Sequence, residues 1–173
     1  MSPAFARVAL IGKSNSPEIA TSLRALAESL RERGCEVLVE QETAALVDAG
    51  LRTVDYDGIG RNADLALVVG GDGTMLAAAR NLVRHGVPLA GVNQGRVGFM
   101  TDIALSDMHS AVDALLEGRY TLEERTLLEA EIQREGKAVL RTIALNEAVV
   151  GRGTQGRLIE FKLYLDGEYV WII

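Results

Sequence analysis

The segment LALVVGGDGT, residues 65–74, decides the fold of this chain. Its first half, Leu65–Val69, is a short run of branched apolar residues, which is typical of a strand buried on both faces of a parallel sheet. The three glycines that follow permit a tight turn and a close approach of the backbone to a ligand. Thr74 is expected to be the N-cap of the next helix. Asp72 would then lie at the carboxyl edge of a sheet, where a bound phosphate and one acid could meet, and this favours phosphoryl transfer.

The flanking residues continue the alternation of strand and helix. A helix is expected to begin at Pro17 with Ser16 as its N-cap and to end at Gly34, and another is expected to run from Thr74 to about His85. The weakly patterned residues 41–62 are expected to hold a short helix over 43–49 and then a loop. The expected strands cover residues 5–11, 35–40, 65–69 and 87–92. Strands that alternate with helices predict an α/β fold with a doubly wound parallel sheet.

The pattern changes after about residue 100. Residues 106–116 are expected to form a helix closed by Gly118, and residues 127–133 and 137–144 are expected to form antiparallel strands. Residues 158–165 and 168–173 are expected to pair across Asp166-Gly167, a strong two-residue hairpin signal. We therefore expect an α/β nucleotide-binding domain over residues 1–104 and the start of an incomplete, mostly β domain over residues 105–173.

The composition narrows the classes of function. The 173 residues are 48% hydrophobic and 24% charged, as in an ordinary globular protein. A net charge of −6 argues against general binding of nucleic acid, which usually needs a basic stripe. The single cysteine excludes an intrachain disulfide and is typical of a reducing compartment. No apolar run approaches the length of a membrane span. We expect a cytoplasmic protein that binds neither membranes nor nucleic acid.

Two other phosphate-binding motifs fit poorly. A dinucleotide fingerprint of the hydride-transfer type that began at Gly71 would need its third glycine at Leu76. A P-loop that ended at Gly12-Lys13-Ser14 would need a glycine at Arg7. The glycine turn at 70–74 could still be a plain strand-to-helix turn, with Asp72 as a helix-capping acid.

Three motifs occur in series: GGDGT at 70–74, GVNQGRVGFMTD at 91–102 and LNE at 145–147. Together they resemble the NAD kinase family, whose members use ATP to phosphorylate the 2′-hydroxyl of the adenosine ribose of NAD. The first motif alone is less specific, because diacylglycerol kinases and 6-phosphofructokinases share forms of it. A lipid kinase of the diacylglycerol type is therefore one alternative, and a catalytically silent remnant of the NAD kinase family is another.

The resemblance implies a role for individual residues. Asp72 corresponds to the acid that accepts the proton of the ribose hydroxyl, and the loop of Gly70, Gly71, Gly73 and Thr74 would bind phosphate. The residues implied at the NAD site are Asp72, Gly73, Asn93, Phe99, Asn146, Glu147 and Arg157. Each has a plainer alternative: a loop or turn residue for the asparagines and Glu147, a core side chain for Phe99, and a solvated arginine for Arg157. No residue is expected to hold a metal by itself, and a divalent cation, Mg²⁺ by preference, would arrive with ATP.

The resemblance also implies a longer protein. In the family, a segment rich in threonine, glycine and serine follows the strand that matches residues 168–173 and completes the NAD pocket. We therefore expect a shortened chain that keeps the catalytic acid but has an incomplete substrate site. Full-length members are expected to form homo-oligomers.

Overall fold

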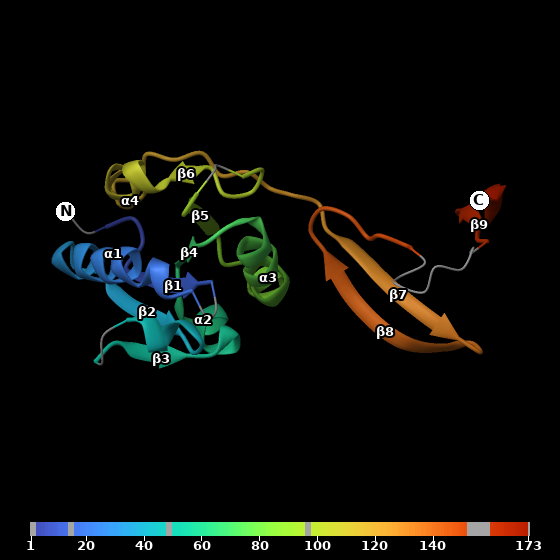
Figure 1. Cartoon of the computed structure of the whole chain (residues 1–173), viewed down its shortest axis with the longest axis horizontal. Helices are drawn as coiled ribbons and strands as arrows, with labels where there is room; N and C mark the ends of the chain where they lie inside the picture. The colour runs from blue at the N-terminus through green and yellow to red at the C-terminus, as the bar shows by residue number, and fades with distance from the viewer. Residues whose placement is uncertain (1–2, 14–15, 48–49, 96–97, 152–159, 173) are drawn as a thin grey trace.

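The structure of the chain is a computed structural model that describes residues 3–13, 16–47, 50–95, 98–151 and 160–172. Within these residues, six parallel strands form one sheet in the order β3-β2-β1-β4-β5-β6 (Figure 1). The strands are β1 (Arg7–Gly12), β2 (Glu36–Glu40), β3 (Arg52–Val54), β4 (Leu65–Val69), β5 (Leu89–Asn93) and β6 (Ile103–Ala104). The helices are α1 (Ala20–Glu32), α2 (Tyr56–Asn62), α3 (Asp72–Leu82) and α4 (Met108–Leu116). The prediction of a doubly wound α/β fold is confirmed.

Helices cover both faces of the sheet, so its central strands are apolar on both sides. In β1, Val8 and Leu10 share a buried cluster with α1 and α4, whereas Ala9 and Ile11 share another with α2 and α3. Every residue of β4 is buried. A strand enclosed on both faces reads as a continuous apolar run, and for this reason residues 65–69 were recognisable in the sequence.

The prediction for residues 41–62 was wrong in its second half. A short 3₁₀ helix does occupy Thr43–Leu46, but β3 and α2 replace the expected loop. The helix α2 begins at an aspartate cap, since Asp55 accepts a 2.7 Å hydrogen bond from the Gly58 amide. Its two glycines lower the helix propensity of this segment, so the sequence did not predict a helix here. Gly60 is needed there because the ring of His85 lies where its side chain would be, 2.2 Å from an ideal Cβ.

Three further differences concern the ends of elements. Ser16 makes no side-chain cap, and Pro17 opens a 3₁₀ turn (Pro17–Ile19) that leads into α1. The helix α3 passes into a 3₁₀ turn, Val83–His85, before left-handed Gly86. The two-residue strand β6 was not predicted, and another 3₁₀ turn, Leu105–Asp107, precedes α4. These elements are too short to show a periodic pattern.

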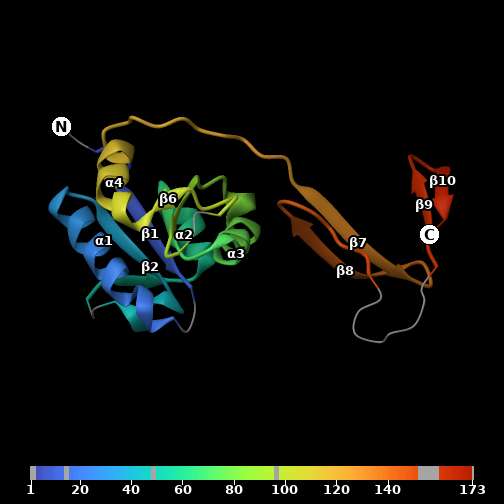
Figure 2. The ribbon, with the colours of Figure 1, turned by 45° about the horizontal axis from the view of Figure 1, so that its top comes forward.

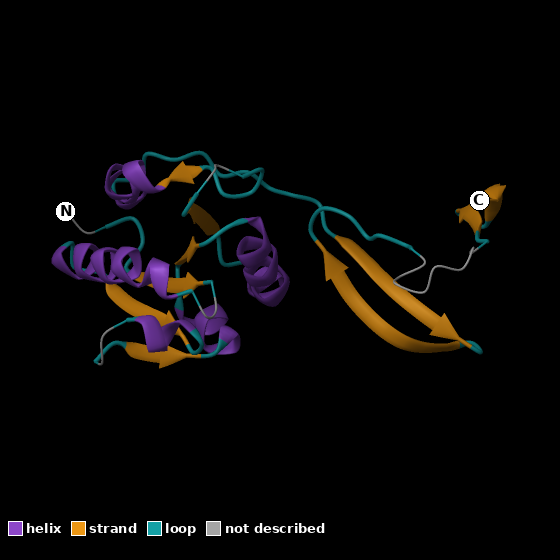
Figure 3. Ribbon diagram, in the orientation of Figure 1, coloured by secondary structure: helices purple, strands orange, loops and turns teal. Residues whose placement is uncertain are grey.

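After α4, the described residues form two antiparallel hairpins, as expected (Figures 2 and 3). The first pairs β7 (Leu128–Arg134) with β8 (Lys137–Ala144), and the second pairs β9 (Lys162–Leu165) with β10 (Glu168–Ile172). Asp166 and Gly167 both have positive φ, as a type I′ turn requires. The β7–β8 hairpin extends away from the sheet and its helices (Figure 2).

The helix α4 packs with the N-terminal sheet rather than with these hairpins. Met108, Val112 and Leu116 belong to the same buried cluster as Val8 and Leu10. The Leu116 carbonyl also accepts a 2.8 Å hydrogen bond from the Ala4 amide. The division into residues 1–104 and 105–173 stays a prediction, and the packing places α4 with the first part.

Candidate functional site

The strand order reverses between β1 and β4, and the carboxyl ends of these two strands meet there. The Lys13 amide, just after β1, donates a 3.1 Å hydrogen bond to the Val69 carbonyl at the end of β4. Open α/β sheets bind their ligands at such a switch point, outside the carboxyl ends of the strands. The glycine turn follows β4 directly and therefore lies at the expected ligand edge.

Gly71, in the glycine turn, is the N-cap of α3, and the helix begins at the next residue, Asp72. The prediction of Thr74 as N-cap was wrong: the Gly71 carbonyl accepts from the amides of Thr74, at 3.0 Å, and Met75, at 3.2 Å, so the helix has already begun. The Thr74 hydroxyl instead lies over Gly70, 2.6 Å from where a Cβ would be. Nothing lies within 4 Å of an ideal Cβ on Gly73, so the space beside this residue is open.

Asp72 is the first residue of α3, and its carboxylate accepts hydrogen bonds from the loop that follows β5. Oδ2 accepts from the Phe99 amide at 3.0 Å. Oδ1 accepts from the Met100 amide at 3.0 Å and from the Thr101 hydroxyl at 3.2 Å. These bonds, the one from Met100 first, hold the pKa of Asp72 below its ordinary value, against a smaller opposing effect of desolvation. The carboxylate is therefore ionised at neutral pH.

A buried polar pair supports this loop from beneath. Thr101 is 0% exposed and Asn93, at the end of β5, is 6% exposed. The Asn93 side-chain amide donates to the Thr101 hydroxyl at 2.7 Å, and its oxygen accepts from the Gly95 amide at 2.8 Å. Asn93 thus lies one layer below the surface that carries Asp72. The sequence prediction had included Thr101 in a motif without assigning it a role.

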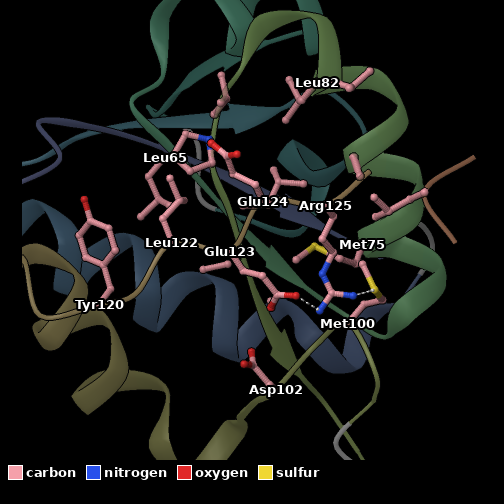
Figure 4. Close-up of a pocket in the computed structure, with 18 of the residues that line it drawn as sticks. Leu65, Met75, Leu82, Met100, Asp102, Tyr120, Leu122, Glu123, Glu124 and Arg125 are labelled. Atoms are coloured by element: carbon pink, nitrogen blue, oxygen red, sulfur yellow. Dashed lines mark hydrogen bonds and ion pairs between the residues drawn. The ribbon is translucent and has the colours of Figure 1, made fainter. Parts of the chain in front are cut away.

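Phe99 is 72% exposed, so the plainer alternative of a core side chain is wrong for this residue. Its ring faces the guanidinium of Arg125, 5.4 Å from the ring centroid. Arg125 also bonds to the Met100 sulfur at 3.5 Å and pairs with Glu123 at 3.0 Å (Figure 4). No sequence signal indicated Arg125, because it lies on the extended segment between α4 and β7.

A cavity of about 730 Å³ lies next to the loop, between α3, β5 and the segment that carries Arg125 (Figure 4). Phe99 and Met100 line this cavity, together with apolar residues of α3 such as Met75 and Leu82. Asp72 does not line it. The hydrogen-bonding geometry around Asp72, rather than this cavity, marks the candidate reacting site.

The remaining predicted residues are Asn146, Glu147 and Arg157. Asn146 and Glu147 are exposed and follow β8, whose end lies beside α3 (Figure 1). Their assignment to the NAD site stays a prediction. Arg157 lies outside the described residues. Among the described residues, no three His, Cys, Asp or Glu side chains gather in a group that could hold a metal ion.

A doubly wound sheet with an ionised acid in a glycine turn at its switch point defines an α/β protein of the class whose ligands bind outside the carboxyl ends of the strands. Residues 8–120 match the family described as "ATP-NAD kinase N-terminal domain". This match covers more than half of the chain. The chain therefore belongs to the NAD kinase family, as the three motifs had indicated.

Relatives and solved structures agree with this assignment. The chain is 52% identical to the NAD kinase of Aromatoleum aromaticum, over 99% of its own length and 58% of the relative, and 50% identical to that of Azoarcus sp., over 99% and 59%. A structure of an Archaeoglobus fulgidus NAD kinase in complex with ATP has a TM-score of 0.66 at 25% identity and covers 96% of this chain and 56% of that one.

The crystal structure of yeast NADH kinase complexed with NADH has a TM-score of 0.81 at 20% identity, and covers 99% of this chain and 55% of that one. At this identity the likeness concerns the fold. The chain thus spans a little under three fifths of the length of the curated relatives it matches. Among the described residues, none of the helices is both long and apolar enough to cross a membrane.

Proposed function

We propose that the family reaction takes place at this sheet edge: transfer of the γ-phosphate of ATP to the 2′-hydroxyl of the adenosine ribose of NAD, which gives NADP. Asp72 is the general base. The observation that carries this role is an ionised carboxylate, oriented by the loop 99–101 and placed beside the open space at Gly73. A positioned base of this kind typically contributes about 10²–10⁴-fold to the rate.

The rest of the turn suits the phosphate groups. The first N–H groups of a helix have no helical partner and attract anions, and α3 presents them beside the glycines at 70, 71 and 73. ATP would bring its own divalent ion, which would help to neutralise the charge that develops during transfer. Mg²⁺ keeps several waters and is held largely by substrate phosphates, so such a complex would need no dedicated cage of protein ligands at this edge.

The NAD contacts assigned to Phe99, Asn146, Glu147 and Arg157 belong to the same proposal, and Asn93, which is buried, would take part by holding the loop from beneath. Phe99 supports it best, because an exposed ring whose face already attracts a guanidinium can also stack on a flat base. The single cysteine, Cys35, supports a cytoplasmic location. Homo-oligomerisation is expected for the family, and light scattering of the purified protein tests it.

The test is a phosphorylation assay with NAD and Mg-ATP on the purified chain and on the Aromatoleum relative. The variant Asp72→Asn keeps the shape of the side chain and removes the base, and Asp102→Asn is its matched control, because Asp102 is an exposed acid at the end of the same loop. We expect loss of transfer in the first variant and little change in the second.

Each other outcome points to a different conclusion. Transfer that survives in the relative without the aspartate that matches Asp72 would remove the assigned role. Binding of NAD in calorimetry without turnover would favour a silent member of the family. Transfer to diacylglycerol but not to NAD would favour the lipid kinase alternative.

A further inference from the structure

We infer that Thr101 is a positioning residue for the Asp72 carboxylate: its hydroxyl occupies Oδ1 and leaves Oδ2 as the oxygen that accepts the proton. The catalytic meaning of this inference rests on the proposed function, but the geometry does not. Thr101 is fully buried, so it cannot touch a substrate and acts only through Asp72.

The direction of each hydrogen bond follows from the side-chain amide of Asn93. Its oxygen accepts from the Gly95 amide, so its nitrogen faces the Thr101 hydroxyl at 2.7 Å. An amide nitrogen can only donate, and the hydroxyl oxygen therefore accepts this bond. The single proton of the hydroxyl is then directed to Oδ1 of Asp72, 3.2 Å away.

The two oxygens of the Asp72 carboxylate differ in how many hydrogen bonds they accept. Oδ1 accepts two hydrogen bonds, from Thr101 and from the Met100 amide, and each carboxylate oxygen has about two lone-pair sites. Oδ2 accepts one, from the Phe99 amide. Oδ2 thus keeps one site for a ribose hydroxyl. The proton would pass to that oxygen as the ribose oxygen bonds to the γ-phosphorus, and the bond from this phosphorus to the β,γ-bridging oxygen would break to release ADP.

Thr101 is itself held firmly. Its carbonyl accepts from the Gly98 amide at 3.1 Å. Its side chain lies so close to β5 that a Cβ on Gly91 would be 2.7 Å from its methyl group. Because backbone and side chain are both fixed, the hydroxyl has little freedom to turn away from Asp72.

The experiment measures the titration of the Asp72 carboxyl carbon by NMR in ¹³C-labelled chain, with Asp72→Asn to assign the signal. Thr101→Val removes the hydroxyl and keeps the shape, and Thr101→Ser keeps the hydroxyl. Loss of a donor to the charged form disfavours that form, so we expect Thr101→Val to raise the midpoint measurably above that of the parent. We expect Thr101→Ser to titrate as the parent does.

An unchanged midpoint in folded Thr101→Val overturns the inference. If that variant does not fold, Thr101→Ala serves instead, since it also removes the hydroxyl, and an unchanged midpoint there has the same consequence. Where transfer to NAD is measurable, the acidic limb of kcat/KM should move in parallel while KM for NAD stays constant. A chain that transfers no phosphate leaves the proposed function contradicted for this chain, whereas the titration still decides the role of Thr101.

Discussion

Gly98→Ala adds one methyl group where the Asp72 carboxylate leaves no room. An ideal Cβ on Gly98 would lie 2.3 Å from Oδ1, 2.8 Å from Cγ and 2.9 Å from Oδ2 of Asp72. Ordinary contact begins near 3.4 Å, so the loop or the carboxylate must move by 1.1 Å, the difference between 3.4 and 2.3 Å. A shift of that size stretches the hydrogen bonds from the amides of Phe99 and Met100, now 3.0 Å each, beyond useful length.

The expected loss of stability can be bounded. Added methylenes at packed positions typically cost about 1–3 kcal/mol, and Gly98 is only half-buried, so we expect the lower end, about 1 kcal/mol. For a chain of this size that corresponds to a fall of about 2–4 °C in Tm. Gly95→Ala in the same loop is the control, because its Cβ would meet its nearest neighbour, Asn93 Oδ1, at an ordinary 3.9 Å.

A double variant separates this contact from other effects of the methyl group. Urea unfolding is measured for Gly98→Ala alone, for Asp72→Ala alone and for both together. If the carboxylate is the obstacle, Gly98→Ala destabilises the parent and has almost no effect in the Asp72→Ala background. Equal losses in the two backgrounds would refute the reasoning, since backbone strain at Gly98 would persist without the carboxylate.

Three further predictions concern the scaffold. Burial, first, and the nearby acids raise the pKa of Tyr56 to about 12, so absorbance titration of tyrosinate should lose its last step in Tyr56→Phe. The hydrogen bond from Arg7 holds the pKa of Asp64 below its ordinary value. This pair therefore stabilises the fold above the ordinary aspartate pKa, and its contribution disappears as the pH falls through the lowered pKa. The Tm of Asp64→Asn should be lower than that of the parent at pH 7, and the difference between the two Tm values should close in acid. Leu67→Ala in the fully buried β4 should cost about 2–5 kcal/mol in urea unfolding, whereas Val139→Ala on the exposed β7–β8 hairpin should stay within about 0.5 kcal/mol.

Within the parallel sheet and its helices, the sequence predicted the elements whose burial is continuous or strictly periodic. The run at 65–69 is buried at every position, and α1 presents a single buried stripe that includes Leu23, Leu26 and Leu30, so local pattern and tertiary environment agree. The strand β3 has three residues, two of them exposed, and β6 has two. Their place in the sheet depends on pairing with distant strands, which no local pattern records.

The candidate site likewise contains residues that the sequence predicted and residues that only the folded chain brings together. Asp72 was found because a strand, a glycine turn and a helix are local features, and a family motif coincides with them. Its partners Phe99, Met100 and Thr101 lie 27–29 residues further along the chain. Gly98 owes its importance to the carboxylate that lies against it in space. Arg125 is more distant still and carries no pattern of its own, so only the folded chain shows it over Phe99.

The hydrogen bonds on Asp72 have two opposite consequences for a general base. They keep the carboxylate ionised at neutral pH, which supplies the required protonation state, but a lowered pKa also makes it a weaker acceptor of a proton. Phosphoryl transfer tolerates this weakness, because its loose transition state depends mainly on positioning and on stabilisation of charge. The same bonds that weaken the base fix its direction, since they fill Oδ1 and leave one acceptor site of Oδ2 open. The role proposed for Asp72 is therefore chiefly one of orientation, and variants that misalign the carboxylate should harm transfer more than variants that shift its pKa.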